Sequence, residues 1–259
     1  MQPPSPPGPS GSPGLIYLLR KRWQALFRAF RVLGRAAADR LPPGVKRVMA
    51  KPVNFADMLL IDHGLFRLVY LNAHRLGTQA WRTAQPAPHD IGRFAKDGIR
   101  TVINLRGVRD CGSYRLEREA CAALSLKLVD FPIGSRQAPE KATIRDAAAL
   151  FANAAYPILI HCKSGADRAG LMSVLYLHLH ESVPIEQALS QLSLRFGHVR
   201  GADTGILDAF FESFLTFNHK SPITFIDWVE KHYDPVELKR AFVANSWSSW
   251  VLGRILGRE

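Results

Sequence analysis

The stretch HCKSGADRAG, residues 161–170, combines residue types that can attack a phosphate group. It lies between a strand-like and a helix-like run, and a loop in that position turns several backbone N–H groups toward one point, which suits a tetrahedral oxyanion. Cys162 begins the loop, where those N–H groups and the helix dipole favour the nucleophilic thiolate. Arg168 ends it, and its planar guanidinium can hold two phosphate oxygens. The pattern predicts a phosphate loop with a cysteine nucleophile; the alternative is a buried, inert cysteine.

The residues between Cys162 and Arg168 are predicted to bind the phosphate mainly through their backbone. Gly165 permits the tight path of the chain, and Ser164 and Ala166 supply further amides. Lys163 adds positive charge above the site, which favours highly anionic substrates.

The elements that must position this loop follow an α/β pattern. Strand-like runs are predicted at 100–105, 126–133 and 157–161. Helices are predicted at 90–96, 114–124, 140–154, 169–181, 184–194, 204–217 and 235–244. We therefore expect a central, mostly parallel sheet flanked by helices.

The loop resembles the His-Cys-x5-Arg signature of the cysteine-dependent protein-tyrosine and dual-specificity phosphatases, in the form found in compact bacterial dual-specificity-like members. Residues 81–86, 101–106 and 129–132 extend the resemblance, which covers about 75–217. It implies a protein-tyrosine-phosphatase-like fold and hydrolysis of phosphomonoesters through a cysteinyl-phosphate intermediate. It implies no metal and no cofactor. Phosphotyrosine or phosphoserine/threonine on a protein is the substrate that the resemblance suggests first.

The resemblance also assigns supporting roles and exposes two departures. His161 would order the loop and tune the thiolate from behind. The loop that often carries the general acid, here 134–139, has no carboxylate. Asp167 matches the Cys-x4-Asp-Arg variant of myotubularin-like lipid phosphatases and is the favoured acid, unless it only pairs with Arg168. Asp130 is the second candidate, with a structural role as its alternative.

The second departure is Ala169, where the family commonly has a hydroxyl that helps the sulfur leave. Three arginines that follow predicted strands could add anion contacts or could simply be solvated: Arg106, Arg109 and Arg136. Three functions therefore stay open. They are a protein phosphatase, a lipid or inositol phosphate phosphatase at a membrane surface, and a non-catalytic binder of phosphorylated ligands.

Charge is distributed unevenly along the 259 residues, whose net charge is +12. Residues 1–51 hold ten of the 34 Lys and Arg and only one acid, Asp39. This disfavours nucleic acid as a partner of the main domain. We predict four segments: a Pro/Gly/Ser leader at 1–14, a basic amphipathic helix and linker at 15–51, a catalytic domain at 52–220, and a C-terminal helical extension at 221–259.

The helix predicted at 15–40 places apolar residues on one side and arginines on the other. That pattern is typical of helices that lie in an anionic membrane surface, although packing on the domain would also use the apolar side. Three cysteines without metal-ligand spacing, and no secretory signal, indicate a cytoplasmic protein, peripheral at the inner membrane surface if the helix binds lipid.

The basic helix predicts salt-sensitive binding to vesicles that contain anionic lipid. Each basic residue near such a surface contributes on the order of 1 kcal/mol, and salt screens that attraction. Deleting residues 1–51 should abolish co-sedimentation with the vesicles at low salt. Equal sedimentation of both forms, or aggregation of the shortened chain, would show that the helix packs on the domain.

Overall fold

A computed structural model of the chain describes residues 42–62 and 64–243. The predicted leader and the basic helix at 15–40 lie outside the described residues. The chain divides into two compact units, 1–53 and 54–259, and the fold that follows is that of the second unit.

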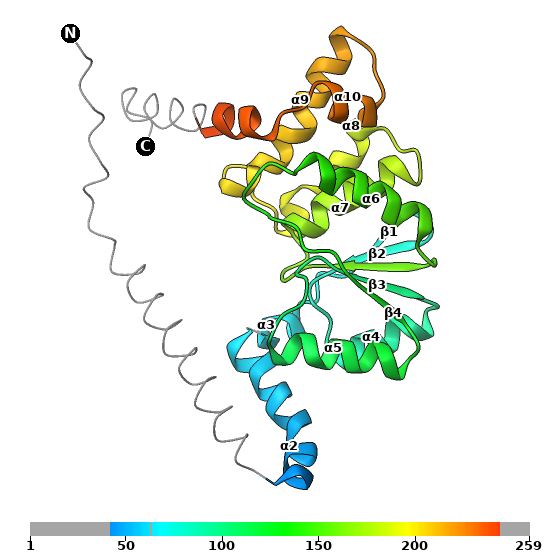
Figure 1. Cartoon of the computed structure of the whole chain (residues 1–259), viewed down its shortest axis with the longest axis vertical. Helices are drawn as coiled ribbons and strands as arrows, with labels where there is room; N and C mark the ends of the chain where they lie inside the picture. Colours follow the sequence, from blue (N-terminus) through cyan, green and yellow to red (C-terminus); the bar gives the residue numbers. More distant parts are fainter. Residues whose placement is uncertain (1–41, 63, 244–259) are drawn as a thin grey trace, which may run out of the picture. The chain divides into compact units, whose positions relative to one another are not determined.

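A five-stranded sheet forms the centre of this unit (Figure 1). Its strands are β1 (His74–Leu76), β2 (Ala80–Thr83), β3 (Thr101–Asn104), β4 (Lys127–Asp130) and β5 (Ile158–His161), in the order β1-β2-β5-β3-β4. Only the β1 pairing is antiparallel; β2, β5, β3 and β4 run parallel. The predicted mostly parallel sheet is confirmed, and β5, which leads into the phosphate loop, lies at its centre.

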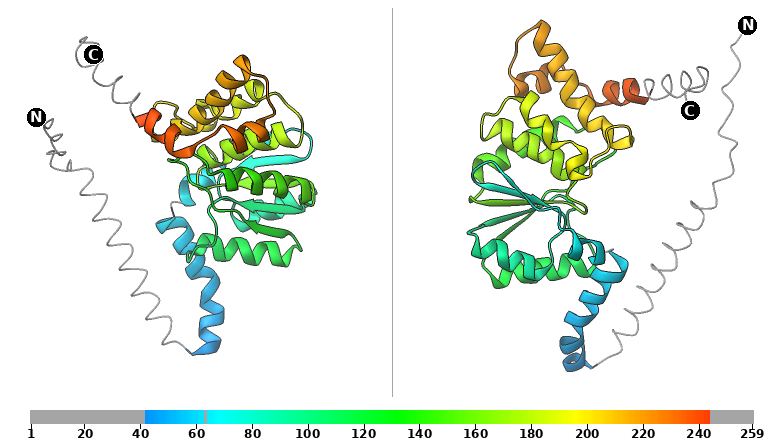
Figure 2. Two further views of the ribbon diagram at one scale, coloured as in Figure 1. Left: turned by 45° about the horizontal axis from the view of Figure 1, so that its top comes forward. Right: turned by 180° about the vertical axis from the view of Figure 1, so that it is seen from behind.

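Helices cover both faces of the sheet (Figures 1 and 2). On one face lie α4 (Pro88–Lys96) and α5 (Gly112–Ala123). On the other lie α6 (Lys141–Asn153), α7 (Asp167–Leu179), α8 (Ile185–Ala188), α9 (Ile206–Lys220) and α10 (Phe225–Lys231). None of the described helices is both long enough and apolar enough to cross a membrane.

The apolar strands bury side chains on both faces, which explains why they read as continuous hydrophobic runs. Val102 and Leu159 contribute to the core beneath α4 and α5, whereas Ile103, Ile158 and Ile160 belong to the larger core beneath α6, α7 and α9. Alternate residues of a strand point to opposite faces, so both cores need apolar side chains.

Two predicted features differ from the structure. The helix predicted at 184–194 is only the short α8, followed by 3₁₀ turns at Leu189–Gln191 and Leu194–Phe196. The predicted linker before residue 52 is instead the start of α2 (Pro43–Ala56), and a π-helical turn (Asp57–Ile61) and α3 (Gly64–Val69) follow. Asp57 and Asp62 bind Gly112 and Arg106, so this segment depends on distant contacts that a local pattern does not reveal.

The start of the predicted C-terminal extension packs into the large core. Phe225, Trp228 and Tyr233 are buried and surround the fully buried Phe210 of α9, with ring centroids 4.9–5.8 Å from it. Residues 235–243 are helical, in agreement with the prediction. The core beneath α7 therefore depends on residues beyond 220.

Phe210→Ala should lower the free energy of unfolding by about 3–5 kcal/mol, because it opens a cavity among four aromatic neighbours. Val236→Ala, at a 63% exposed position, is the control and should cost less than about 0.5 kcal/mol. Urea unfolding of both variants measures the difference. A loss below about 1 kcal/mol for Phe210→Ala would contradict a shared core.

Candidate active site

The phosphate loop leaves the carboxyl end of the central strand. His161 ends β5 and lies in register with Thr83 of β2 and Asn104 of β3, while α7 begins at Asp167. Loops at the carboxyl ends of parallel strands meet at one edge of the sheet, where α/β proteins commonly bind ligands. Residues that follow β2 and β3 therefore flank the loop.

The carbonyl groups of residues 163–166 each accept a hydrogen bond from outside the loop. The oxygen of Lys163 accepts from the backbone N–H of Gln85 at 3.4 Å, and that of Ser164 accepts from Asn72 Nδ2 at 2.9 Å. The oxygens of Gly165 and Ala166 both accept from one Arg82 nitrogen, at 2.7 and 3.0 Å.

The loop amides have no such partners. Within the part of the chain that the structure describes, no amide of residues 163–166 donates to a protein acceptor. Gly165 has a φ of +73°, and a Cβ there would lie 2.7 Å from the Ala84 nitrogen, so glycine is required. Because the carbonyl oxygens of residues 163–166 are bound on one side of the loop, the backbone N–H groups face the opposite side. This is the arrangement of a backbone nest that binds an anion.

Arg82 is the residue that fixes this arrangement, and sequence analysis gave it no role. Its side chain is fully buried and its guanidinium lies 4.1 Å from the centroid of the Phe196 ring. Its other terminal nitrogen donates to the backbone and side-chain oxygens of Gln191, at 2.7 and 2.9 Å. Burial lowers the pKa of Arg82 to about 10. An arginine inside a predicted buried strand was the available signal, because such a cation needs several acceptors.

Cys162 and Arg168 lie at the two ends of this loop. Cys162 is buried with 2% of its surface exposed. Arg168 is half-buried, and one terminal nitrogen donates to the Leu105 oxygen at 3.2 Å. Its Nε is buried and has no hydrogen-bond partner among the described residues. Both predicted residues are thus brought to one loop that already presents free amides.

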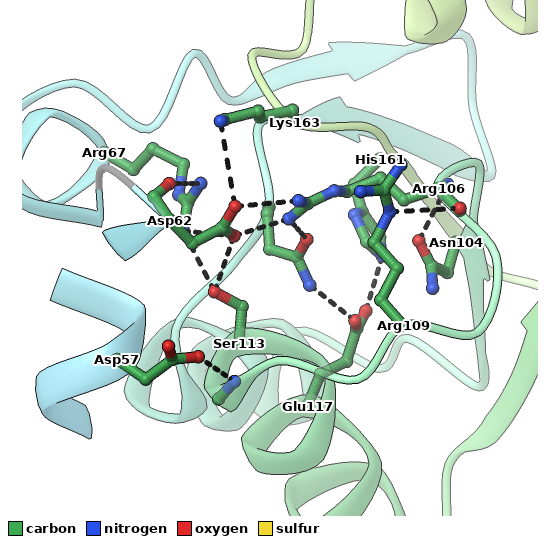
Figure 3. A network of polar contacts seen from close by, with 12 residues as sticks. Asp57, Asp62, Arg67, Asn104, Arg106, Arg109, Ser113, Glu117, His161 and Lys163 are labelled. Carbon is green, nitrogen blue, oxygen red and sulfur yellow. Dashed lines mark hydrogen bonds and ion pairs between the residues drawn. The ribbon is translucent and has the colours of Figure 1, made fainter. Parts of the chain in front are cut away.

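A chain of polar side chains lies behind the loop (Figure 3). His161 Nε2 lies 2.5 Å from Glu117 Oε1, and both side chains are fully buried. Gln85 donates to the second Glu117 oxygen at 2.6 Å and accepts from Arg106. Arg106 in turn forms a bidentate ion pair with Asp62, in which its two terminal nitrogens donate to the two carboxylate oxygens at 2.6 and 2.8 Å. His161 therefore lies at the start of the loop beside Glu117, to which sequence analysis gave no role, and its supporting role stays a prediction.

Asp62 joins this chain to the loop lysine. Its carboxylate also accepts from Ser113 at 2.7 Å and lies 3.7 Å from Lys163 Nζ (Figure 3). Burial would raise the pKa of Asp62, but hydrogen bonds from Arg106 and Ser113 and the nearby arginine charges hold it well below its usual range. Arg106 is thus a buried ion-pair residue and not a solvated surface arginine.

The remaining predicted candidates have different surroundings. Arg109 is exposed beside the site, and its Nε donates to the Arg106 oxygen at 3.4 Å. Arg136 is exposed, and no hydrogen bond or ion pair links it to the loop in the described chain. Asp130 accepts from Tyr114 at 2.6 Å and Asn104 at 2.8 Å, which favours its structural alternative.

Asp167 is paired with histidine and not with Arg168. Its Oδ1 lies 2.8 Å from His198 Nδ1, and His198 Nε2 lies 2.7 Å from Asp208 Oδ2. Burial would lower the pKa of His198, but its two carboxylate partners raise it to about 9. Across residues 42–62 and 64–243, no group of three or more His, Cys, Asp or Glu residues is arranged to hold a metal ion.

Comparison with known families agrees with this geometry. A family described as "DSP-PTPase phosphatase fused to NAD+ Kinase" matches residues 70–204, just over half of the chain. The chain belongs to this phosphatase family. The resemblance predicted from the loop is confirmed. A search of curated proteins finds no match.

Solved structures of phosphatases are similar to the chain at low identity. TpbA of P. aeruginosa is 17% identical over 61% of this chain and 88% of its own, with a TM-score of 0.48. The active form of Tk-PTP is 19% identical over 55% and 98%, with a TM-score of 0.43. The core domain of the PP-IP phosphatase SIW14 from S. cerevisiae, in complex with citrate, is 14% identical over 60% and 96%, with a TM-score of 0.45.

Arg82→Lys should destabilise the chain by about 3 kcal/mol, because an ammonium cannot serve all four carbonyl oxygens and a buried oxygen without a donor is costly. The stabilising effect of inorganic phosphate on the melting temperature should shrink as well. Arg75→Lys makes the same change at an exposed position of β1 and is the control. Unchanged stability of Arg82→Lys would contradict its role in fixing the loop.

Proposed function

We propose that the chain is a phosphomonoester hydrolase in which Cys162 is the nucleophile. The observation that carries this proposal is the orientation of the loop, whose carbonyls are bound on one side while the amides of residues 163–166 stay available. Several N–H groups aimed at one point stabilise the charge that develops on phosphoryl oxygens. The same groups favour the Cys162 thiolate.

The first step forms a bond between the Cys162 sulfur and phosphorus while the ester oxygen leaves. Arg168 and the amides of Lys163, Ser164, Gly165 and Ala166 hold the other phosphoryl oxygens. In the second step water attacks phosphorus, the sulfur leaves as thiolate and phosphate is released. His161, held by Glu117, orders the start of the loop.

Asp167 is the residue that we assign to proton transfer. It begins α7 directly beside Arg168, and 26% of its side chain is exposed, so a substrate or water can reach it. Both oxygens of Asp130 are already hydrogen bonded to Tyr114 and Asn104, which argues against it. Ala169 is fully buried and brings no hydroxyl to assist the departing sulfur. The second step is therefore expected to be slow.

Phosphoproteins are one substrate class, and a polyanionic phosphate such as an inositol phosphate or a phosphoinositide headgroup is the other. A specific observation favours the second. Burial, together with the charges of Arg106, Arg67 and Arg109, lowers the pKa of Lys163, and Asp62 only partly offsets them. Cations that repel one another beside the loop gain stability when a ligand with several negative charges binds.

Cys162→Ser should reduce phosphate release at least about a thousandfold while the protein still binds inorganic phosphate, because a hydroxyl lacks the thiolate's nucleophilicity but leaves the amides in place. Release is measured on p-nitrophenyl phosphate, phosphopeptides, inositol phosphates and phosphoinositide vesicles.

Cys121→Ser is the control. Burial raises the pKa of the Cys121 thiol to about 12, so that cysteine stays protonated and its loss should spare turnover. Near-normal activity of Cys162→Ser would refute the cysteine mechanism. No release from any substrate by the unaltered protein would favour the non-catalytic binder.

A further inference from the structure

Three titratable side chains from separate elements form one line that ends at the phosphate loop. Asp167 begins α7, His198 follows the turn at Gly197, and Asp208 lies in the first turn of α9. Both ring nitrogens of the fully buried His198 face carboxylate oxygens, at 2.8 and 2.7 Å. Sequence analysis gave neither His198 nor Asp208 a role.

The geometry fixes how many protons the group holds. A neutral imidazole can donate from one nitrogen only, so two contacts with carboxylates require a second proton. The groups that face His198 are Asp167 from α7 and Asp208 from α9, and their two charges favour an imidazolium. The charge of Arg82 on β2 also reaches Asp167.

Asp167 therefore has one oxygen committed and one available. Oδ1 accepts from His198, whereas Oδ2 has no hydrogen-bond partner in the described chain. A positive partner favours the ionised form of a carboxyl group, and an ionised carboxylate can accept a proton but has none to donate. The acid role predicted for Asp167 stays a prediction, and this contact favours the opposite direction of transfer.

We propose that His198, backed by Asp208, is a positioning residue that orients the Asp167 carboxylate to take a proton from the attacking water. This inference rests on the proposed function. In the second step the water oxygen bonds to phosphorus, its proton passes to Asp167 Oδ2, and the S–P bond breaks with its electron pair returning to Cys162.

The proposal also determines which substrates the first step accepts. With the Asp167 carboxylate acting as a base, the P–O bond breaks without protonation, so the leaving oxygen departs as an anion. Leaving groups of low pKa, as in aryl phosphates and phosphoanhydrides, suit this step, whereas simple alkyl phosphates do not. Within the polyanionic class proposed above, this step favours a phosphoanhydride, whose leaving group is a stable anion, over an ester of an inositol hydroxyl.

First-turnover kinetics separate the two steps on the full chain. With p-nitrophenyl phosphate, nitrophenolate released in the first turnover reports S–P bond formation, and kcat reports hydrolysis when the second step is slow. His198→Gln should lower kcat at least about tenfold while kcat/KM and the burst of one nitrophenolate per Cys162 stay within about threefold. Asp208→Asn should act in the same direction, more weakly.

His178→Gln is the matched control, because His178 is a partly buried α7 histidine that bonds to Val183 away from the loop. It should leave both steps unchanged. A purely structural role for His198 would instead reduce the burst and kcat/KM together with kcat, and that result would overturn the proposal. If His198→Gln instead loses kcat/KM on alkyl phosphates alone and keeps its kcat on the aryl substrate, Asp167 is an acid and the proposal is overturned.

Nitrogen NMR of the imidazole supplies a readout independent of activity. His198 should carry protons on both nitrogens at pH 7.5, and Asp208→Asn should make it lose one at a lower pH. A neutral His198 at pH 7.5 would overturn the proposal. Full turnover by Cys162→Ser would instead refute the proposed function itself, and this role with it.

Discussion

The buried guanidinium of Arg82 is the interaction on which the site depends. It donates to the carbonyls of Gly165 and Ala166 inside the loop and to Gln191 outside it, and Phe196 covers its face. Charge-assisted hydrogen bonds contribute about 1.5–3 kcal/mol each, which offsets the cost of burying the cation. No carboxylate neutralises Arg82 at close range in the described chain, so its positive charge adds to the potential that an anion meets above the loop.

Two polar networks flank this loop and differ in charge. On one side Arg106, Arg67 and Lys163 share the single carboxylate of Asp62, which leaves excess positive charge. On the other side His198 lies between Asp167 and Asp208, which leaves excess negative charge. A phosphate ester between them would meet cations beside its phosphoryl oxygens and a carboxylate beside the incoming water. The loop therefore binds the phosphoryl group, and the difference in charge between the two networks orients the bound ester.

Much of this arrangement follows from local sequence. Strands β3, β4 and β5, the loop and α7 could be predicted because an apolar run, a glycine and a helical pattern each act within a few residues. The supporting residues could not be predicted in the same way. Arg82 and Gly165 are 83 positions apart, Asp62 and Arg106 are 44 apart, and Asp167 and His198 are 31 apart. Arginine and aspartate are common surface residue types, and only the tertiary fold brings their partners close.

Asp62 has a consequence for where the functional domain begins. It lies before residue 70, where the match to the phosphatase family starts, yet it is the carboxylate that pairs with Arg106 within the network behind His161. A fragment cut at that match would lose the carboxylate that forms both ion-pair contacts with the buried Arg106, and removing one partner of a buried pair typically costs about 3–5 kcal/mol. The smallest unit that can fold around this site therefore extends at least to Asp62, which directly follows the π-helical turn and lies before the first strand of the sheet.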